Sequence, residues 1–181
     1  CDDESDSAQA VTRDYTLEVA DEAGKAPLLS VFGGKLTTYR KLAEHAIEKL
    51  AHYYPGIGNA WTKNGTLPGG DMGTDRNSYV AQLRRKFTWL PDELAIRFAH
   101  TYGSRTEMLL ANRASLADLG EDFGHGLYQA ELEYLTTYEW AVELDDVIWR
   151  RTKLGMWLDD AQKQRVAEWL KETVGKKVAF A

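Results

Sequence analysis

The segment Ser30-Val31-Phe32-Gly33-Gly34-Lys35-Leu36-Thr37-Thr38-Tyr39-Arg40 decides how the first part of this chain folds. Its apolar half, which ends at Phe32, is typical of a strand, and paired glycines then lead into an amphipathic helix. Because glycine has no Cβ, the backbone can turn sharply here and a ligand can approach it closely. The first N–H groups of the helix have no acceptor within the helix and carry the positive end of its dipole. With Lys35 beside them, the turn predicts a site for an anionic or electron-rich ligand.

Two strands are predicted before the turn, at about residues 10–20 and 28–33. Apolar residues occupy alternate positions of the first, which is the period of a half-buried strand: Val11, Tyr15, Leu17 and Val19. Arg13 falls on the same parity, and a guanidinium on an inward face is costly unless an anion meets it. The anion is either a carboxylate such as Asp14 or a bound ligand, and the pattern leaves both open.

A long helix is predicted over about residues 36–54, because its apolar residues recur at helical spacing. Arg40 and Glu44 form an i,i+4 pair on its other side. Pro55 and Gly56 end the helix, and the Gly- and Pro-containing stretch 56–77 is typical of a linker.

Residues 78–181 predict a helical domain, and short connections favour an antiparallel helical bundle. Its helices are expected at about 78–89, from Pro91 to Gly103, from a capping box at Ser104–Glu107 onward, and at about 124–140, 143–154 and 159–174. The last is capped by Asp159 or Asp160. The Trp and Tyr residues are interpreted as core. The expected fold class is therefore mainly α.

Composition excludes several classes of function. The net charge of −6 argues against a nucleic-acid binder, and residues 1–34 alone carry eight acidic against two basic side chains. Cys1 is the one cysteine, which excludes a disulfide framework and fits a reducing compartment. No apolar run reaches the roughly 18 residues that span a membrane. The abrupt start at Cys-Asp-Asp-Glu leads us to expect a fragment of a longer protein.

Other polar clusters have structural explanations. Asp118–His125 collects three carboxylates and a histidine, but its glycines favour a tight loop whose acids cap a helix near His125 over a metal site. The Trp149–Lys153 segment is either a basic patch for phosphate or lipid, or the solvated end of a helix, which cations favour. His45 and His52 are expected at or near the surface. No catalytic residue or metal ligand is assigned. No Gly-x-Gly-x-x-Gly motif follows a strand, so a dinucleotide's pyrophosphate site is not expected in this chain.

The chain resembles the C-terminal part of bacterial aerobic, FAD-dependent glycerol-3-phosphate dehydrogenases. The resemblance covers nearly the whole chain and is carried by these segments: Cys1–Ser7, Thr12–Tyr15, Ser30–Glu48, Leu67–Gly70, Tyr102–Ser104, Asp118–His125 and Trp149–Lys153. It implies that residues 1–55 are the end of an α/β FAD- and substrate-binding domain whose N-terminal part is not in this chain.

The resemblance also implies roles for particular residues. Glycerol-3-phosphate would be oxidised to dihydroxyacetone phosphate, with electrons passing through FAD to membrane quinone. Arg13 and Lys35 would bind the substrate, and the turn would meet the flavin through these residues: Gly33, Gly34, Lys35, Leu36 and Thr37. An arginine fork suits a phosphate, and a helix N-terminus stabilises charge on a reduced flavin.

Further expectations concern the parent protein. It would lie in the cytoplasm, peripheral on the inner membrane, and the helical domain would brace the turn and help form a homodimer or a membrane-facing surface. The isolated chain is expected to be inactive and not to retain FAD. Two alternatives stay open: an oxidase of the same flavin superfamily that uses oxygen, and an autonomous helical interaction module.

Overall fold

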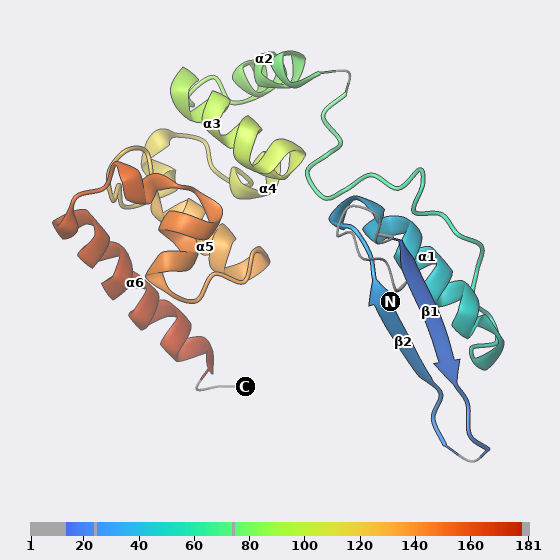
Figure 1. Ribbon diagram of the computed structural model, residues 1–181. Coiled ribbons are helices and arrows are strands. Elements are labelled where there is room, and N and C mark those ends of the chain that lie inside the picture. Colours follow the sequence, from blue (N-terminus) through green and yellow to red (C-terminus); the bar gives the residue numbers. More distant parts are fainter. Residues whose placement is uncertain (1–13, 24, 74, 179–181) are drawn as a thin grey trace, which may run out of the picture. The chain divides into compact units, whose positions relative to one another are not determined.

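The computed structural model describes residues 14–23, 25–73 and 75–178, and the chain divides into two compact units at Gly65 (Figure 1). The described part of the first unit is a β-hairpin with one helical segment, and that of the second is helical. The mainly α fold that the sequence predicts is confirmed.

The hairpin consists of β1 (Tyr15–Ala20) and β2 (Leu28–Gly33), which pair antiparallel from Tyr15 opposite Gly33 to Ala20 opposite Leu28. Tyr15, Leu17 and Val19 are half-buried while the residues between them are exposed, as period-two alternation predicts. The predicted strands are therefore confirmed where the structure describes them, whereas residues 10–13 lie outside the described part.

A continuous helical segment follows the turn: a 3-10 turn (Leu36–Thr38), α1 (Tyr39–Leu50) and a second 3-10 turn (Ala51–Tyr53). Figure 1 shows α1 running along the hairpin. No described side chain of residues 14–65 is fully buried, and Tyr39 and Ile47 of the expected apolar stripe are more than half exposed. The described part of the hairpin and helix therefore does not form a closed core.

The second unit contains five α-helices and a π-helical turn within its described residues: α2 (Arg76–Lys86), α3 (Asp92–Tyr102), α4 (Thr106–Leu109), α5 (Gln129–Tyr138), the π-helix Asp146–Arg151 and α6 (Asp160–Val178). Three 3-10 turns connect them: Gly103–Arg105, Leu116–Leu119 and Leu154–Met156. The helix starts at Pro91 and Asp159 are confirmed, and Asp159 Oδ1 accepts the Gln162 amide at 2.8 Å.

Two helix starts were predicted wrongly. The helix expected at 78–89 starts at Arg76, because Asp75 Oδ1 accepts the Ser78 amide at 2.9 Å, and it ends at Lys86. The capping box expected at Ser104–Glu107 does not form, since Gly103–Arg105 is a 3-10 turn that leads directly into α4. A capping box is present instead at Ser115, where Asp118 accepts the Ser115 amide at 2.8 Å.

The helices expected at 124–140 and 143–154 are shorter than predicted. Residues 124–126 all have positive φ, which an α-helix excludes, and Asp122 bridges to Tyr128, so α5 starts only at Gln129. Of the helix expected at 143–154, the structure forms the π-helix Asp146–Arg151. This helix ends before Lys153, whose backbone is left-handed (φ 62°).

The hydrophobic core of the described chain lies in the second unit. Its largest fully buried apolar side chains come from several helices and from the loops between them, and they include Phe98, Phe123, Leu127, Leu132, Leu135 and Ile148. Each such burial stabilises the fold by about 1.5–3 kcal/mol. The interpretation of the aromatic residues as core holds for Tyr79, Tyr102 and Tyr134, but Trp140 and Trp157 are mostly exposed.

Candidate functional site

The Gly33-Gly34 turn has a backbone that only glycine adopts easily. The φ angles are 76° at Gly33 and 115° at Gly34. A Cβ on Gly33 would lie 2.7 Å from the carbonyl oxygen of Asp14, so the opposite strand also excludes a side chain. The backbone conformation therefore explains both glycines. Because glycine has no side chain, only backbone is exposed on the outer side of the turn.

Lys35 and Thr38 fix the entry into the helix. The Lys35 amide donates to Thr38 Oγ1 at 3.3 Å, while the Thr38 hydroxyl and amide donate to the Lys35 carbonyl oxygen at 2.9 and 3.0 Å. The Lys35 amide is thereby engaged within the turn. Leu36 and Thr37 occupy the first helical positions, where N–H groups have no acceptor inside the helix.

All five residues predicted to contact the flavin lie together and exposed, Leu36 to 91%. The amides of Leu36 and Thr37 and the charge of Lys35 are groups of the kinds that bind anions. Arg13, the other predicted substrate ligand, lies outside the described residues.

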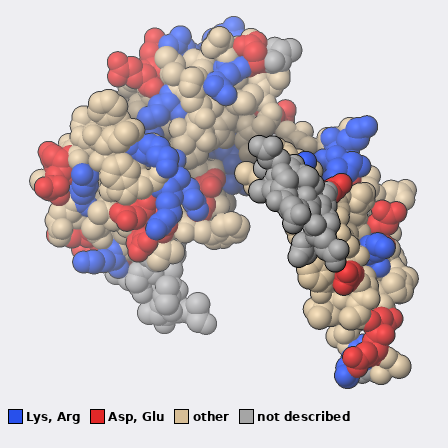
Figure 2. Space-filling view, viewed as in Figure 1, with Lys and Arg blue, Asp and Glu red and all other residues tan. Residues whose placement is uncertain are grey.

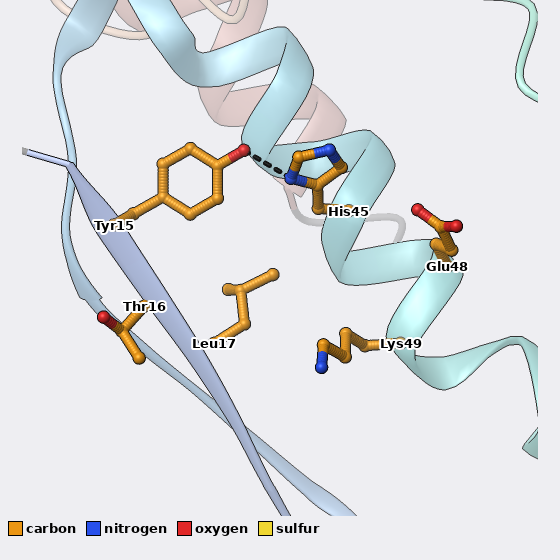
Figure 3. Close-up of a pocket in the computed structure, with 6 residues that line it drawn as sticks. All are labelled: Tyr15, Thr16, Leu17, His45, Glu48 and Lys49. Atoms are coloured by element: carbon orange, nitrogen blue, oxygen red, sulfur yellow. Dashed lines mark hydrogen bonds between the residues drawn. The ribbon is translucent and has the colours of Figure 1, made fainter.

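An open hollow lies between β1 and α1 (Figure 3). It is lined by Tyr15, Thr16, Leu17, His45, Glu48 and Lys49. The Tyr15 hydroxyl and Nδ1 of His45 lie 2.6 Å apart and share a hydrogen bond between strand and helix. The sequence analysis missed this pair. Its signal was a tyrosine on the inward strand parity and a histidine in the helix that follows the hairpin.

The other side of α1 holds the segment that follows the helix. Arg40 Nη1 and Thr62 Oγ1 both donate to Glu44 Oε1, at 2.6 and 2.5 Å, which confirms the predicted Arg40–Glu44 pair. The Thr62 hydrogen bond, with Lys41 and Arg40, lowers the pKa of Glu44 to about 2. This cluster anchors the connecting segment and has no evident catalytic role.

The carboxylates of Asp118–His125 serve local structure. Asp118 Oδ2 accepts the amides of Ala114 and Ser115, each at 2.8 Å, and these hydrogen bonds lower the pKa of Asp118. Asp122 accepts the Gly124 amide, and Glu121 pairs with Arg165 at 2.8 Å. The predicted cap of a helix near His125 is therefore wrong, because Asp118 caps the 3-10 turn Leu116–Leu119 and α5 starts only at Gln129. Among the residues that the structure describes, no group of His, Cys, Asp and Glu is arranged to hold a metal ion.

A buried ion pair joins α3 to α5. Arg97 donates to both carboxylate oxygens of Glu131 at 2.6 Å, and the Tyr102 hydroxyl donates to the same carboxylate. Glu131 is fully buried. Burial and the Glu131 charge raise the pKa of Tyr102 well above its usual value. In the sequence, Glu131 lies within a mainly apolar helix, and no pattern indicates that Arg97 is its partner.

The basic Trp149–Lys153 segment is the solvated end of a helix. Arg150 pairs with Asp146 at 2.7 Å and with Glu143 at 2.9 Å, and Arg151 donates to the Glu139 carbonyl oxygen. Figure 2 shows basic and acidic side chains together across the visible face of the helical unit. None of the described helices is long and apolar enough to cross a membrane.

The chain thus has two parts. The first is a hairpin and helix with an exposed Gly-Gly-Lys turn, and the second is a helical domain with its own core. Residues 60–179 match the family described as the C-terminal domain of alpha-glycerophosphate oxidase. The chain belongs to this family.

Its relatives are sugar-alcohol phosphate dehydrogenases by name. The chain is 60% identical over its whole length to the aerobic glycerol-3-phosphate dehydrogenase of Escherichia coli (strain K12), and matches 36% of that protein. It is 49% identical over 94% of its length to a glycerol-3-phosphate dehydrogenase of Pseudomonas aeruginosa, of which 33% is covered. It is also 40% identical over 93% of its length to the D-erythritol 1-phosphate dehydrogenase of Brucella abortus, of which 34% is covered. The chain spans about a third of the length of these relatives.

Proposed function

We propose that this chain is the C-terminal part of a flavoprotein that oxidises glycerol-3-phosphate to dihydroxyacetone phosphate and passes electrons through FAD to membrane quinone. The observation that carries the proposal is the exposed turn, in which a lysine and two helix-start amides follow paired glycines. Its residue pattern fits a flavin edge, and the most similar relatives named above are dehydrogenases of this substrate.

The residues of the turn would bind and orient. The amides of Leu36 and Thr37 would face the pyrimidine edge of the flavin, and the bare surface of Gly33 and Gly34 would let the ring approach. The chemistry that FAD would supply when bound is acceptance of a hydride, here from C2 of glycerol-3-phosphate. Lys35 and Arg13 would hold the substrate, Arg13 through the two-pronged contact that a guanidinium makes with phosphate. We assign the base that takes the hydroxyl proton to the part of the parent protein outside this chain.

The test is Lys35→Ala in the complete protein, measured by flavin content and by glycerol-3-phosphate:quinone activity. Loss of a charge-assisted contact is worth about 1.5–3 kcal/mol, so we expect kcat/KM to fall about 10- to 100-fold. Lys63→Ala is the matched control, since Lys63 is also an exposed lysine of the same unit. Kinetics equal to the control would remove Lys35 from the site.

Oxygen as electron acceptor is the second candidate, because the matching family is named for an oxidase. Hydrogen peroxide formed in proportion to glycerol-3-phosphate consumed would favour it, whereas quinone reduction without peroxide would favour the dehydrogenase.

A third possibility is that the helical domain is an interaction module in its own right, since it has its own core. We expect limited proteolysis of the chain to leave this domain intact. We further propose that it braces the turn in the parent and helps form a homodimer or a surface that faces the membrane from the cytoplasm. Deleting residues 67–181 from the complete protein should then lower solubility and flavin retention, and unchanged flavin content and activity would reject the bracing role.

A further inference from the structure

The Tyr15–His45 hydrogen bond lies directly behind the turn that the proposed function uses. Tyr15 pairs with Gly33 across the hairpin, and its Cβ lies 3.8 Å from where a side chain of Gly34 would start. The Tyr15 side chain thus backs the two glycines, while its hydroxyl reaches His45 in the middle of α1 (Figure 3). This hydrogen bond therefore connects α1, the helix after the turn, to β1, the strand that pairs with the strand before the turn.

A second tyrosine, in the 3-10 turn that follows α1, fastens the other end of the same helical segment to the hairpin. The Tyr53 hydroxyl donates to Asp21 Oδ2 at 2.7 Å, just beyond the last residue of β1. The two hydrogen bonds, Tyr15–His45 and Tyr53–Asp21, hold α1 along the hairpin, but only the first lies at the turn. None of the described side chains of this unit is fully buried, so apolar packing within the described residues constrains the helix only weakly.

We propose that Tyr15 and His45 are a positioning pair that sets the orientation of the Gly-Gly-Lys turn toward flavin and substrate. A hydrogen bond is directional, so it opposes rotation and sliding of α1 that an apolar contact would permit. In the tautomer protonated at Nε2, the Tyr15 hydroxyl donates to Nδ1 of His45. Neither residue takes part in the chemistry. This inference rests on the proposed function, since it assigns the pair's effect to the same turn.

The experiment uses the complete flavin-loaded protein with Tyr15→Phe and His45→Leu, each of which removes the hydrogen bond. We expect kcat/KM for glycerol-3-phosphate to fall about 5- to 20-fold, mostly through KM, with a shifted flavin absorption spectrum, as losing one positioning bond would give. His45→Asn keeps an acceptor close to the position of Nδ1 and should restore more than half of the lost kcat/KM.

Tyr53→Phe is the matched control, because it removes the hydrogen bond at the far end by the same substitution. Equal kinetic losses in Tyr15→Phe and Tyr53→Phe would overturn the proposal, since a general loosening of the helix would then explain both. Normal kinetics in Tyr15→Phe, with Lys35→Ala impaired, would also overturn it and leave the proposed function standing. Normal kinetics in Lys35→Ala would remove Lys35 from the site and reject the positioning role, whereas absence of glycerol-3-phosphate oxidation in the unmodified complete protein would reject the proposed function.

Discussion

The buried ion pair between Arg97 and Glu131 gives the sharpest stability prediction. The Arg97 side chain is 21% exposed and that of Glu131 is 0% exposed, and two 2.6 Å contacts join them. Arg97→Met would remove the compensating charge and leave a carboxylate deep in the core, with the Tyr102 hydroxyl as a remaining partner. Breaking a buried pair in this way costs about 3–5 kcal/mol.

Thermal unfolding followed by circular dichroism measures this cost. For a domain of this size, about 1 kcal/mol corresponds to about 3–6 °C, so we expect Arg97→Met to lower Tm by about 10 °C or more. Arg84→Met is the matched control, because the Arg84–Asp92 pair is exposed and should contribute at most about 1 kcal/mol.

A double variant that removes both charges tests whether the unpaired Glu131 carboxylate causes the loss of stability. Adding Glu131→Leu to Arg97→Met removes the unpaired charge, so the double variant should regain more than half of the lost stability. The Tyr102 hydroxyl then has lost its acceptor, and adding Tyr102→Phe should recover about 1 kcal/mol more. A double variant no more stable than Arg97→Met would refute the assignment of the loss to an unpaired buried carboxylate.

Three further predictions follow from single residues. Gly103→Ala should destabilise the chain by at least about 1–3 kcal/mol in urea unfolding, since φ is 55° and a Cβ would meet backbone at 1.9 Å, and more than Gly73→Ala, where φ is 77° but nothing lies within 4 Å. The pKa of Glu44 is about 2 when folded and 4.5 when unfolded, so its contribution to stability is present above pH 4.5 and is lost as pH falls toward 2. Thr62→Val should raise that pKa toward 4.5 in an NMR titration, and an unchanged pKa would exclude the hydrogen bond. The pKa of Tyr102 is raised above 10.0, so its contribution is complete below pH 10 and is lost as pH rises further, and Tyr102→Phe should flatten the alkaline unfolding curve.

Local rules in the sequence predicted the hairpin and the long helix well. Strand alternation around Tyr15 and the stop at Pro55 depend only on neighbouring residues, and Asp159 caps its helix for the same reason. Errors arose where backbone conformation overrode helical periodicity. The positive φ angles at residues 124–126 delay α5; the glycines of this segment indicated a tight loop, but not that it continues to Tyr128.

The candidate site was predictable only in part. The Gly-Gly-Lys turn is contiguous in the sequence, so its residues could be named together. The Tyr15–His45 and Arg97–Glu131 pairs join residues about 30 positions apart, and only the fold brings such partners into contact.

The contact between Gly69 and the end of α3 also bears on how chimaeras of these proteins should be spliced. The Ser104 amide donates to the Gly69 carbonyl oxygen at 3.0 Å, and a Cβ on Gly69 would lie 2.5 Å from the carbonyl oxygen of Tyr102. Residues 67–70 are thus part of the helical unit, although their Gly and Pro content is typical of a linker. A chimaera joined before Leu67 takes both sides of this contact from one protein. A chimaera joined at Arg76, the first residue of α2, takes Gly69 and the end of α3 from two different proteins, at a contact too close for a side chain.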